Sequence, residues 1–175
     1  RKTGLLLDPY FSASKLEWIL SNKPLLKDNK NLAFGTLDSW LIFKLTGEHL
    51  TDISNASRTL LFNINDFRWD RELLDIFSVP DRILPEVRPN YGNGIFGYTD
   101  NGTVFRRKIP VCSVFGDQQA ALFGQMCFNE GDSKSTFGTG SFLMMNTGGK
   151  KIESKNNLLS TIFYQDTSGK VYYAL

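Results

Sequence analysis

The fold of this chain is constrained most by a glycine between an apolar run and a helix-forming run. The residues Val-Cys-Ser-Val-Phe, starting at Val111, are typical of a short apolar strand, which Gly116 ends. The next residues, Asp-Gln-Gln-Ala-Ala-Leu-Phe from Asp117, are compatible with a helix that breaks at Gly124. Asp117 is a favourable N-cap, because its carboxylate can accept the free N–H groups of the first turn. The sequence therefore predicts a carboxylate and two amides at the carboxyl end of a strand, which is where ligands bind in open α/β sheets.

A second candidate follows at Gly138, Thr139 and Gly140, which are typical of a hairpin tip. The glycines let the backbone take positive φ and leave N–H groups unshielded. Consecutive N–H groups in such a turn form a concavity that suits phosphate, and Thr139 adds a hydroxyl. The plainer alternatives are a helix-capping Asp117 and an ordinary hairpin turn, and the chain has no Walker motif. Residue types alone indicate a phosphate or polyol site and go no further.

Composition indicates a folded globular protein and excludes some classes of function. The chain has 175 residues, of which 41% are hydrophobic, and a net charge of +2 gives no reason to expect nucleic acid or an anionic membrane as a partner. No apolar run approaches the length of a membrane span. Cys112 and Cys127 lie in apolar contexts and are expected to be buried, inert thiols, which favours the cytoplasm. His49 lies in a polar stretch and is expected at the surface.

The remaining periodicity predicts helices and strands in alternation, followed by a part rich in hairpins. We expect helices over residues 12–20, 36–45 and 71–77. Ser12 and Thr36 should cap the first two, Gly47 should end the second, and Trp69-Asp70 should open the third. The middle helix should bury a stripe formed by Leu37, Trp40, Leu41 and Leu45. We expect turns at residues 8–11 and 100–102, and strands over residues 32–34, 60–64, 95–98, 132–137, 142–146, 158–164 and 171–174. This order indicates a mixed α/β protein.

One polar segment of small residues, Thr-Asp-Ile-Ser-Asn-Ala-Ser-Arg-Thr from Thr51 to Thr59, lies between two apolar segments. Such a segment can line a cleft or form a solvated loop, and the residues alone do not distinguish the two. The chain does not begin with Met, and it ends at Leu175 without a turn residue or a charged tail. We therefore expect it to be an excerpt from a longer protein.

Distinctive motifs occur along nearly the whole chain. They are DPYFS from Asp8 with KLEW from Lys15, GTLDSWL from Gly35, DISNASRT from Asp52, LPEVR from Leu84, GDQQAALFGQ from Gly116 and FGTGSFLMMNTG from Phe137. Together they resemble the motifs of the FGGY carbohydrate kinases, and of the glycerol kinases among them. The run from Gly116 to Gln125 is highly specific in combination.

The resemblance implies an α/β, actin-like and ribonuclease H-like kinase fold with two domains that face each other across a cleft. Residues 1–125 would be the C-terminal part of the N-terminal, glycerol-binding domain. Residues 126–175 would be the truncated start of the C-terminal, nucleotide-binding domain. The implied reaction is ATP-dependent phosphorylation of the terminal hydroxyl of glycerol in the presence of Mg²⁺, in a cytoplasmic enzyme whose full-length form is a homo-oligomer.

The resemblance also implies roles for individual residues. Asp117 matches the catalytic base of the family, and it contacts the substrate as well. Tyr10 and Gln118 match its glycerol contacts, and Phe142 matches a ring that packs on the glycerol backbone. Gly138, Thr139 and Gly140 match the turn that binds the nucleotide phosphates. No residue of this chain matches a metal ligand.

The chain departs from the family in what it lacks. The amino-terminal phosphate loop, the Arg-Glu pair that holds glycerol and the adenine-binding part are absent from the 175 residues. We therefore expect this chain to be inactive by itself. The alternatives are a related FGGY kinase for another sugar or polyol, and a polyol-binding relative without catalysis, against which the intact Asp117 argues.

Overall fold

The computed structural model describes residues 1–91, 96–99 and 105–175. The expected turn at residues 100–102 and the start of the expected strand at residues 95–98 lie outside these ranges. The helices are α1 (Ser12–Asn22), α2 (Leu37–Thr46), α3 (Ile53–Ala56), α4 (Arg71–Ile76) and α5 (Asp117–Gly124), with short 3-10 helices at Pro24–Asp28 and Asp81–Ile83. The strands are β1 (Leu50–Asp52), β2 (Phe62–Asn63), β3 (Arg68–Trp69), β4 (Glu86–Arg88), β5 (Ser133–Phe137), β6 (Ser141–Gly148), β7 (Thr161–Gln165) and β8 (Val171–Ala174).

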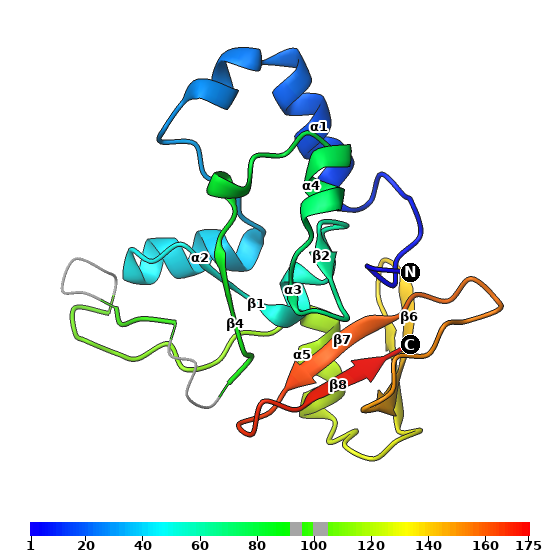
Figure 1. The fold of residues 1–175 in the computed structure, drawn as a ribbon. Helices are drawn as coiled ribbons and strands as arrows, with labels where there is room; N and C mark the ends of the chain where they lie inside the picture. The colour runs from blue at the N-terminus through cyan, green and yellow to red at the C-terminus, as the bar shows by residue number, and fades with distance from the viewer. Residues whose placement is uncertain (92–95, 100–104) are drawn as a thin grey trace.

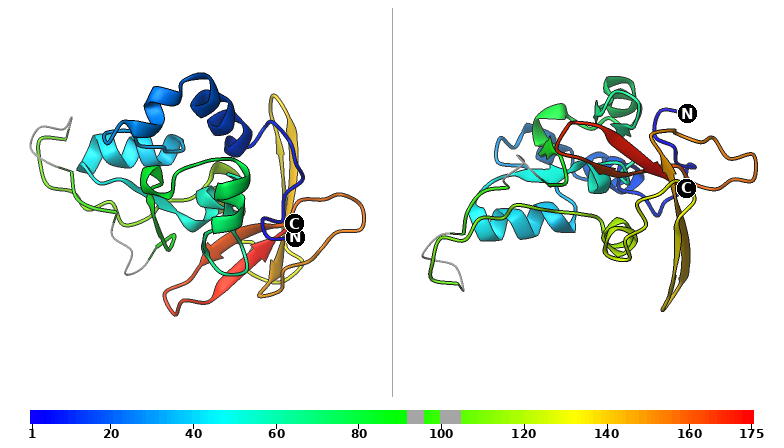
Figure 2. Two further views of the ribbon diagram at one scale, coloured as in Figure 1. Left: turned by 45° about the horizontal axis from the view of Figure 1, so that its top comes forward. Right: turned by 90° about the horizontal axis from the view of Figure 1, so that it is seen from below.

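The described strands form two small pairs and one larger sheet (Figure 1). β1 and β4 are parallel, β2 and β3 are antiparallel, and the larger sheet has the order β5-β6-β8-β7 with all neighbours antiparallel. Figure 2 shows the β5–β6 hairpin as a long, narrow arm beside β7 and β8, with the two chain termini near each other. The hairpin-rich part after Gly124 was therefore predicted correctly.

Two expected strands, residues 32–34 and 111–115, are wrong because neither segment forms a ladder with a neighbour. Val111 instead exchanges single backbone hydrogen bonds with Phe96 (2.7 Å) and Gly97 (2.9 Å), and Val114 donates to the Asn90 carbonyl at 3.0 Å. Isolated bonds of this kind satisfy an extended backbone without making a strand.

The first helix buries a narrower face than expected. Ala13 and Leu20 are buried and Leu16 is partly buried, whereas Ile19 is 41% exposed. Residues 13, 16 and 20 follow the spacing of one helical face, and Ile19 falls beside it. The residue at the N-cap position is Phe11, so Ser12 is the first helical residue and not the cap.

The stripe predicted for the second helix is also wrong. Leu37, Trp40 and Leu41 are 84%, 60% and 56% exposed, and the helix packs through Ser39 and Ile42 instead. This helix is apolar on nearly every side, so its periodicity selects no single face. Thr36 occupies the N-cap position without a side-chain cap bond, and Gly47 ends the helix with a φ of 82°, as expected.

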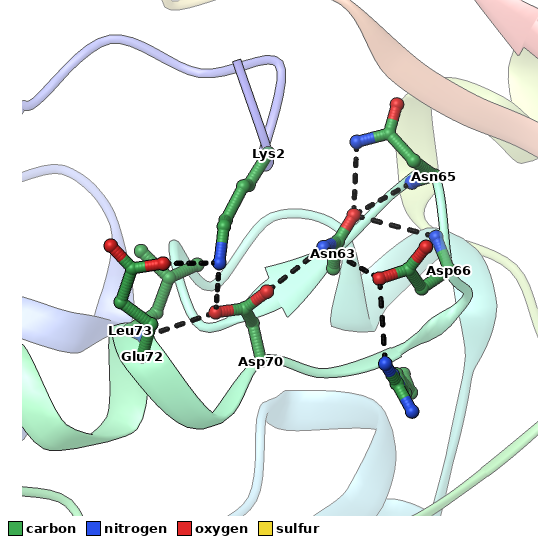
Figure 3. A network of polar contacts seen from close by, with 8 residues as sticks. Lys2, Asn63, Asn65, Asp66, Asp70, Glu72 and Leu73 are labelled. Atoms are coloured by element: carbon green, nitrogen blue, oxygen red, sulfur yellow. Dashed lines mark hydrogen bonds and ion pairs between the residues drawn. The ribbon is translucent and has the colours of Figure 1, made fainter.

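The third expected helix, α4, is confirmed together with its start signal. The Asp70 carboxylate accepts a hydrogen bond from the Leu73 N–H at 3.2 Å. Lys2 reaches the same helix and bonds Asp70 at 2.9 Å and Glu72 at 2.5 Å (Figure 3). Asn63 donates to the second Asp70 oxygen at 2.8 Å, so the first residues of the chain and β2 are both joined to the start of this helix.

The part of the chain after Gln125 packs directly on the part before it. One core cluster joins Ile53 and Phe62 to Ile162 and Tyr173, and all four are buried. The Tyr173 hydroxyl donates to the Ile64 carbonyl at 3.0 Å. The two segments therefore share a hydrophobic core, and β7 and β8 hold the earlier elements in place.

The polar segment at residues 51–59 is not a solvated loop, because most of it is buried. Two of its residues, Asn55 and Arg58, line a hollow, so the expectation that it lines a cleft holds for this part. Asp52 is fully buried and accepts hydrogen bonds from the Ser54 N–H (2.7 Å), the Ser54 hydroxyl, the Asn55 amide (2.5 Å) and the Asn90 amide (2.6 Å). The Ser54 hydroxyl accepts from the Gly116 N–H at 2.8 Å. The network therefore fixes the residue that precedes α5.

Gly4 lies where the part of the chain before Gln125 closely approaches the part after it, and its substitution tests that contact. Its φ is +71°, and an added Cβ would lie 2.3 Å from the Ser160 carbonyl oxygen. At Gly169, with a φ of +88°, an added Cβ meets nothing within 4 Å. We expect Gly169→Ala to cost about 1 to 2 kcal/mol from the left-handed backbone alone. Gly4→Ala should cost about 2 to 5 kcal/mol, because overpacking adds to that strain. Urea unfolding measures both, and equal losses would contradict this packing.

Asp52 should make the stability of the fold depend on pH. Burial raises the pKa of this carboxyl group from 3.8 to about 6, against the hydrogen bonds from Ser54 and Asn55, which lower it. The folded chain therefore binds more protons than the unfolded chain between these values, so stability falls as the pH rises from 4 to 6 and then levels off. Relative to Asp52→Asn, the unaltered chain should be more stable at pH 4 than at pH 7 by about 2 kcal/mol. A difference in unfolding free energy that stays constant over this range would contradict the assignment.

Candidate active site

Helix α5 begins at Asp117 as expected, but Asp117 is not its cap. Gly116 occupies the N-cap position, and its carbonyl accepts from the Ala120 N–H at 2.7 Å. An added Cβ on Gly116 would lie 2.6 Å from the Gln119 side-chain oxygen, so a larger residue here would displace the buried Gln119 side chain. The Asp117 carboxylate accepts from the Gln118 N–H at 2.7 Å and is exposed. It is therefore available to a ligand.

The opposite side of α5 is fixed to the sheet. Gln119 is 2% exposed, and its amide donates to the Ile162 carbonyl at 3.2 Å and the Thr161 hydroxyl at 3.3 Å. Leu122 is also buried and belongs to a core cluster with Phe163. With one face held in this way, the first turn presents Asp117 and Gln118 away from the core.

Asp117 and Gln118 line a hollow of about 470 Å³. The structure brings all four residues that were expected to contact the polyol to this hollow: Tyr10 from the loop before α1, Asp117 and Gln118 from α5, and Phe142 from β6. The other lining residues are Asn55, Arg58, Gly116, Gln119, Ser133, Leu143, Met144, Met145, Leu158, Leu159, Thr161 and Leu175. A few polar groups against a largely apolar wall are typical of a site for a small molecule.

The loop that carries Tyr10 is held by its own hydrogen bonds. The Asp8 carboxylate accepts from the Tyr10 N–H at 2.7 Å, and the Asp8 carbonyl accepts from the Phe11 N–H at 3.2 Å, which confirms the expected turn. Lys15 reaches back to donate to the Tyr10 carbonyl at 2.6 Å. The Tyr10 ring itself is 69% exposed and free to contact a ligand.

Two cationic residues near Asp117 were missed in the reading of the sequence. The Arg58 guanidinium lines the hollow and lies 5.1 Å from the centre of the Phe11 ring. Burial lowers the pKa of Arg58, and the nearby Tyr10 and Asp117 side chains oppose that shift. Burial likewise lowers the pKa of Lys134 in β5, and Asp117 opposes this shift too. Alternation in β5 places Lys134 and Thr136 on one face, but both residues are polar, so the sequence did not indicate that this face points inward.

The turn at residues 138–140 is a hairpin tip, as expected, but its geometry differs. Neither Gly138 nor Gly140 has a positive φ, and the Gly138 N–H donates to the Gly140 carbonyl at 2.9 Å. Among the described residues that line the hollow, none comes from this turn. The reason is the register of the hairpin, in which Thr136 pairs with Phe142 and the tip extends beyond that pair. Asp117 and the turn are therefore not parts of one hollow.

The two cysteines and the histidine were each expected in a particular environment. Cys127 is buried, but Cys112 is exposed, so the expectation of two buried thiols holds for one of them. His49 is half-buried, with Nε2 2.6 Å from the Phe34 carbonyl oxygen, and it lies outside the hollow. Within the described ranges, no helix is both long and apolar enough to pass through a membrane.

Comparison with curated proteins finds relatives over almost the entire chain. The glycerol kinases of Haloarcula marismortui and Haloferax volcanii are each 50% identical to it over 187 aligned residues, which cover 99% of this chain. The chain spans 37% of the length of each of these relatives.

Solved structures give the same result for the fold. The Plasmodium falciparum glycerol kinase with ADP has a TM-score of 0.92 and 40% identity, and the match covers 99% of this chain and 35% of that one. A xylulose kinase from Rhodospirillum rubrum, 16% identical, has a TM-score of 0.80 over 99% of this chain and 35% of its own length. The expected actin-like, ribonuclease H-like kinase fold is thereby confirmed.

A comparison with protein families places most of the chain in one of them. Residues 1–124 match the N-terminal domain of the FGGY family of carbohydrate kinases. That match includes Tyr10, Asp117 and Gln118, three of the four residues that were expected to contact the polyol. The chain belongs to the FGGY family of carbohydrate kinases.

Proposed function

We propose that this chain is part of a glycerol kinase, which transfers the γ-phosphoryl group of ATP to a terminal hydroxyl of glycerol and forms sn-glycerol 3-phosphate. The two curated relatives at 50% identity carry the name glycerol kinase, and the solved Plasmodium relative was crystallised with ADP. These names favour glycerol over another sugar or polyol. The exposed Asp117 in the hollow argues against a relative that only binds a polyol.

The observation that carries the proposal is an exposed Asp117 carboxylate beside an amide donor in a hollow with an aromatic wall. A primary alcohol is a poor nucleophile, and Asp117 can accept its proton as the bond to phosphorus forms. Gln118 and Tyr10 can exchange hydrogen bonds with the hydroxyl groups, and the half-exposed Phe142 ring can cover the carbon backbone. An uncharged triol needs this combination of polar and apolar contacts.

We assign Gly138, Thr139 and Gly140 to the nucleotide phosphates. All three are exposed at the end of the β5–β6 hairpin, beyond the Phe137–Ser141 pair, which is next to the pair that includes Phe142. The Thr139 hydroxyl and the backbone N–H groups of the turn are the donors on which this assignment depends. When bound, Mg²⁺ would offset the phosphate charge. Asp117 is the acidic side chain among the described lining residues, which fits an ion held mainly by phosphate oxygens.

We place the border between two domains near Gln125. The family match ends at residue 124, and the larger sheet begins with β5 soon afterwards. Residues 1–125 would then belong to the glycerol-binding domain and residues 126–175 to the start of the nucleotide-binding domain. The cytoplasmic location and homo-oligomeric assembly of the longer enzyme rest on the family resemblance.

The proposal predicts a specific kinetic effect for Asp117→Asn in the longer enzyme that includes this chain. The turnover number should fall by about 10²- to 10⁴-fold, because the amide cannot accept the hydroxyl proton. The KM for glycerol should change only a few-fold, since Tyr10, Gln118 and Phe142 remain. An assay of ADP formation at saturating ATP measures both quantities.

The matched control is Asp166→Asn, which changes an exposed carboxylate in the turn between β7 and β8 that bonds Ser168 and Lys170. It should leave the turnover number within about twofold, as expected for a surface substitution. The 175-residue chain alone should show no turnover. An Asp117→Asn enzyme with normal turnover would remove Asp117 as the base.

A further inference from the structure

Lys134 is a buried cation that the proposed reaction does not yet explain. It is 2% exposed and projects inward from β5. Its ammonium group donates to the Gln118 side-chain oxygen and, at 2.6 Å, to the Thr136 hydroxyl. Burying an ammonium group costs free energy even when it is hydrogen-bonded, so an apolar side chain of similar size would satisfy the core at least as well. The position of Lys134 beside Gln118 therefore suggests a role other than stability.

The chemistry of this contact determines how the Gln118 amide is oriented. An ammonium group has three donors and no acceptor, so Gln118 must turn its carbonyl oxygen toward Lys134. The Gln118 NH₂ group then faces Asp117, and its nitrogen lies 3.2 Å from the second carboxylate oxygen. The first carboxylate oxygen accepts from the Gln118 backbone N–H at 2.7 Å. Both oxygens of Asp117 are thus held by Gln118, whose side chain is held by Lys134.

We propose that Lys134 is a positioning residue that fixes the Gln118 amide with its NH₂ group toward Asp117 and the hollow. This inference rests on the proposed function, because it assigns Lys134 a part in presenting the base. Without the ammonium group, the amide can rotate by half a turn and place its oxygen against the carboxylate. That arrangement repels Asp117 and also removes the donor that Gln118 offers to a substrate oxygen.

The same geometry restricts the substrate group that Gln118 can recognise. The Gln118 NH₂ group directs one hydrogen at Asp117 and has one hydrogen left for a ligand. The Gln118 oxygen is turned toward Lys134, so Gln118 offers the hollow no acceptor. A hydroxyl oxygen can accept that hydrogen while the hydroxyl proton goes to Asp117. Lys134 therefore keeps the Gln118 NH₂ donor and the Asp117 carboxylate acceptor in the arrangement that one alcohol group requires.

The test is Lys134→Met in the longer enzyme, because Met removes the charge and keeps much of the side-chain length. We expect kcat to fall by about 10- to 100-fold, as for other losses of precise orientation. The KM for glycerol should change less than about threefold, since the other contacts remain, and the thermal midpoint should stay the same or rise. If Lys134 only stabilised the fold, its substitution would lower the thermal midpoint and would not lower kcat selectively relative to KM.

A double-mutant cycle shows whether Lys134 acts through Gln118. In a Gln118→Ala background, Lys134→Met should have less than about a twofold further effect on kcat, because the amide it positions is gone. Full additivity of the two losses would overturn the proposal. Lys151→Met is the matched control, since Lys151 is also largely covered and bonds Asn65 at 2.7 Å and the Arg1 carbonyl at 3.1 Å outside the hollow. It should retain normal kcat.

A second variant keeps the proposal testable if Lys134→Met does not fold. Gln118→Glu retains Lys134 and gives it a carboxylate partner, but it removes the NH₂ group that faces Asp117. We expect a fall in kcat comparable to that of Lys134→Met, and an unchanged kcat in either variant would overturn the proposal. The two proposals can fail separately. An unaltered longer enzyme that does not phosphorylate glycerol contradicts the proposed function, whereas an active enzyme that tolerates Lys134→Met contradicts only the role of Lys134.

Discussion

The hydrogen bond from the Gly116 N–H to the Ser54 hydroxyl is the contact on which the candidate site depends. Ser54 is itself held by the buried Asp52 carboxylate, which also binds Asn90. Because α5 starts directly after Gly116, this network determines where the first helical turn lies. Gln119 fixes the same turn from the sheet side through Ile162. Asp117, between these two anchors, has little freedom except at its side chain.

Polar groups are buried around the site at some cost to the fold. The Asp52 carboxylate is fully buried, and the Lys134 ammonium group nearly so. Each is satisfied by several hydrogen bonds, which reduces the cost of removing a charge from water but does not cancel it. Apolar residues at these positions could pack as well but could not orient Gly116 or Gln118. Asp52 and Lys134 therefore reduce the stability of the fold at the positions where they determine the orientation of Asp117.

The sequence predicted best those features that depend on neighbouring residues. The start of α4 after Asp70, the end of α2 at Gly47 and the β5–β6 hairpin depend on short-range chemistry, and all three are confirmed. The buried face of α2 was wrong, because an almost entirely apolar helix carries no periodic signal. Gln118 was one of the two amides predicted after the strand, whereas Tyr10 and Phe142 were named only through the family resemblance. Lys134 was missed because its contact with Gln118 joins a strand to a helix, and spacing along the chain does not show such contacts.

A crystal structure of the longer enzyme with glycerol bound would show whether the anchored start of α5 presents Asp117 to the hydroxyl that is phosphorylated. We expect a terminal hydroxyl within about 2.6 to 3.2 Å of an Asp117 carboxylate oxygen, which is the range for proton transfer to a base. We also expect the Gln118 NH₂ group to face the same hydroxyl and the Phe142 ring to lie against the carbon chain. Glycerol bound away from Asp117, or a Gln118 oxygen turned toward the carboxylate, would contradict this expectation.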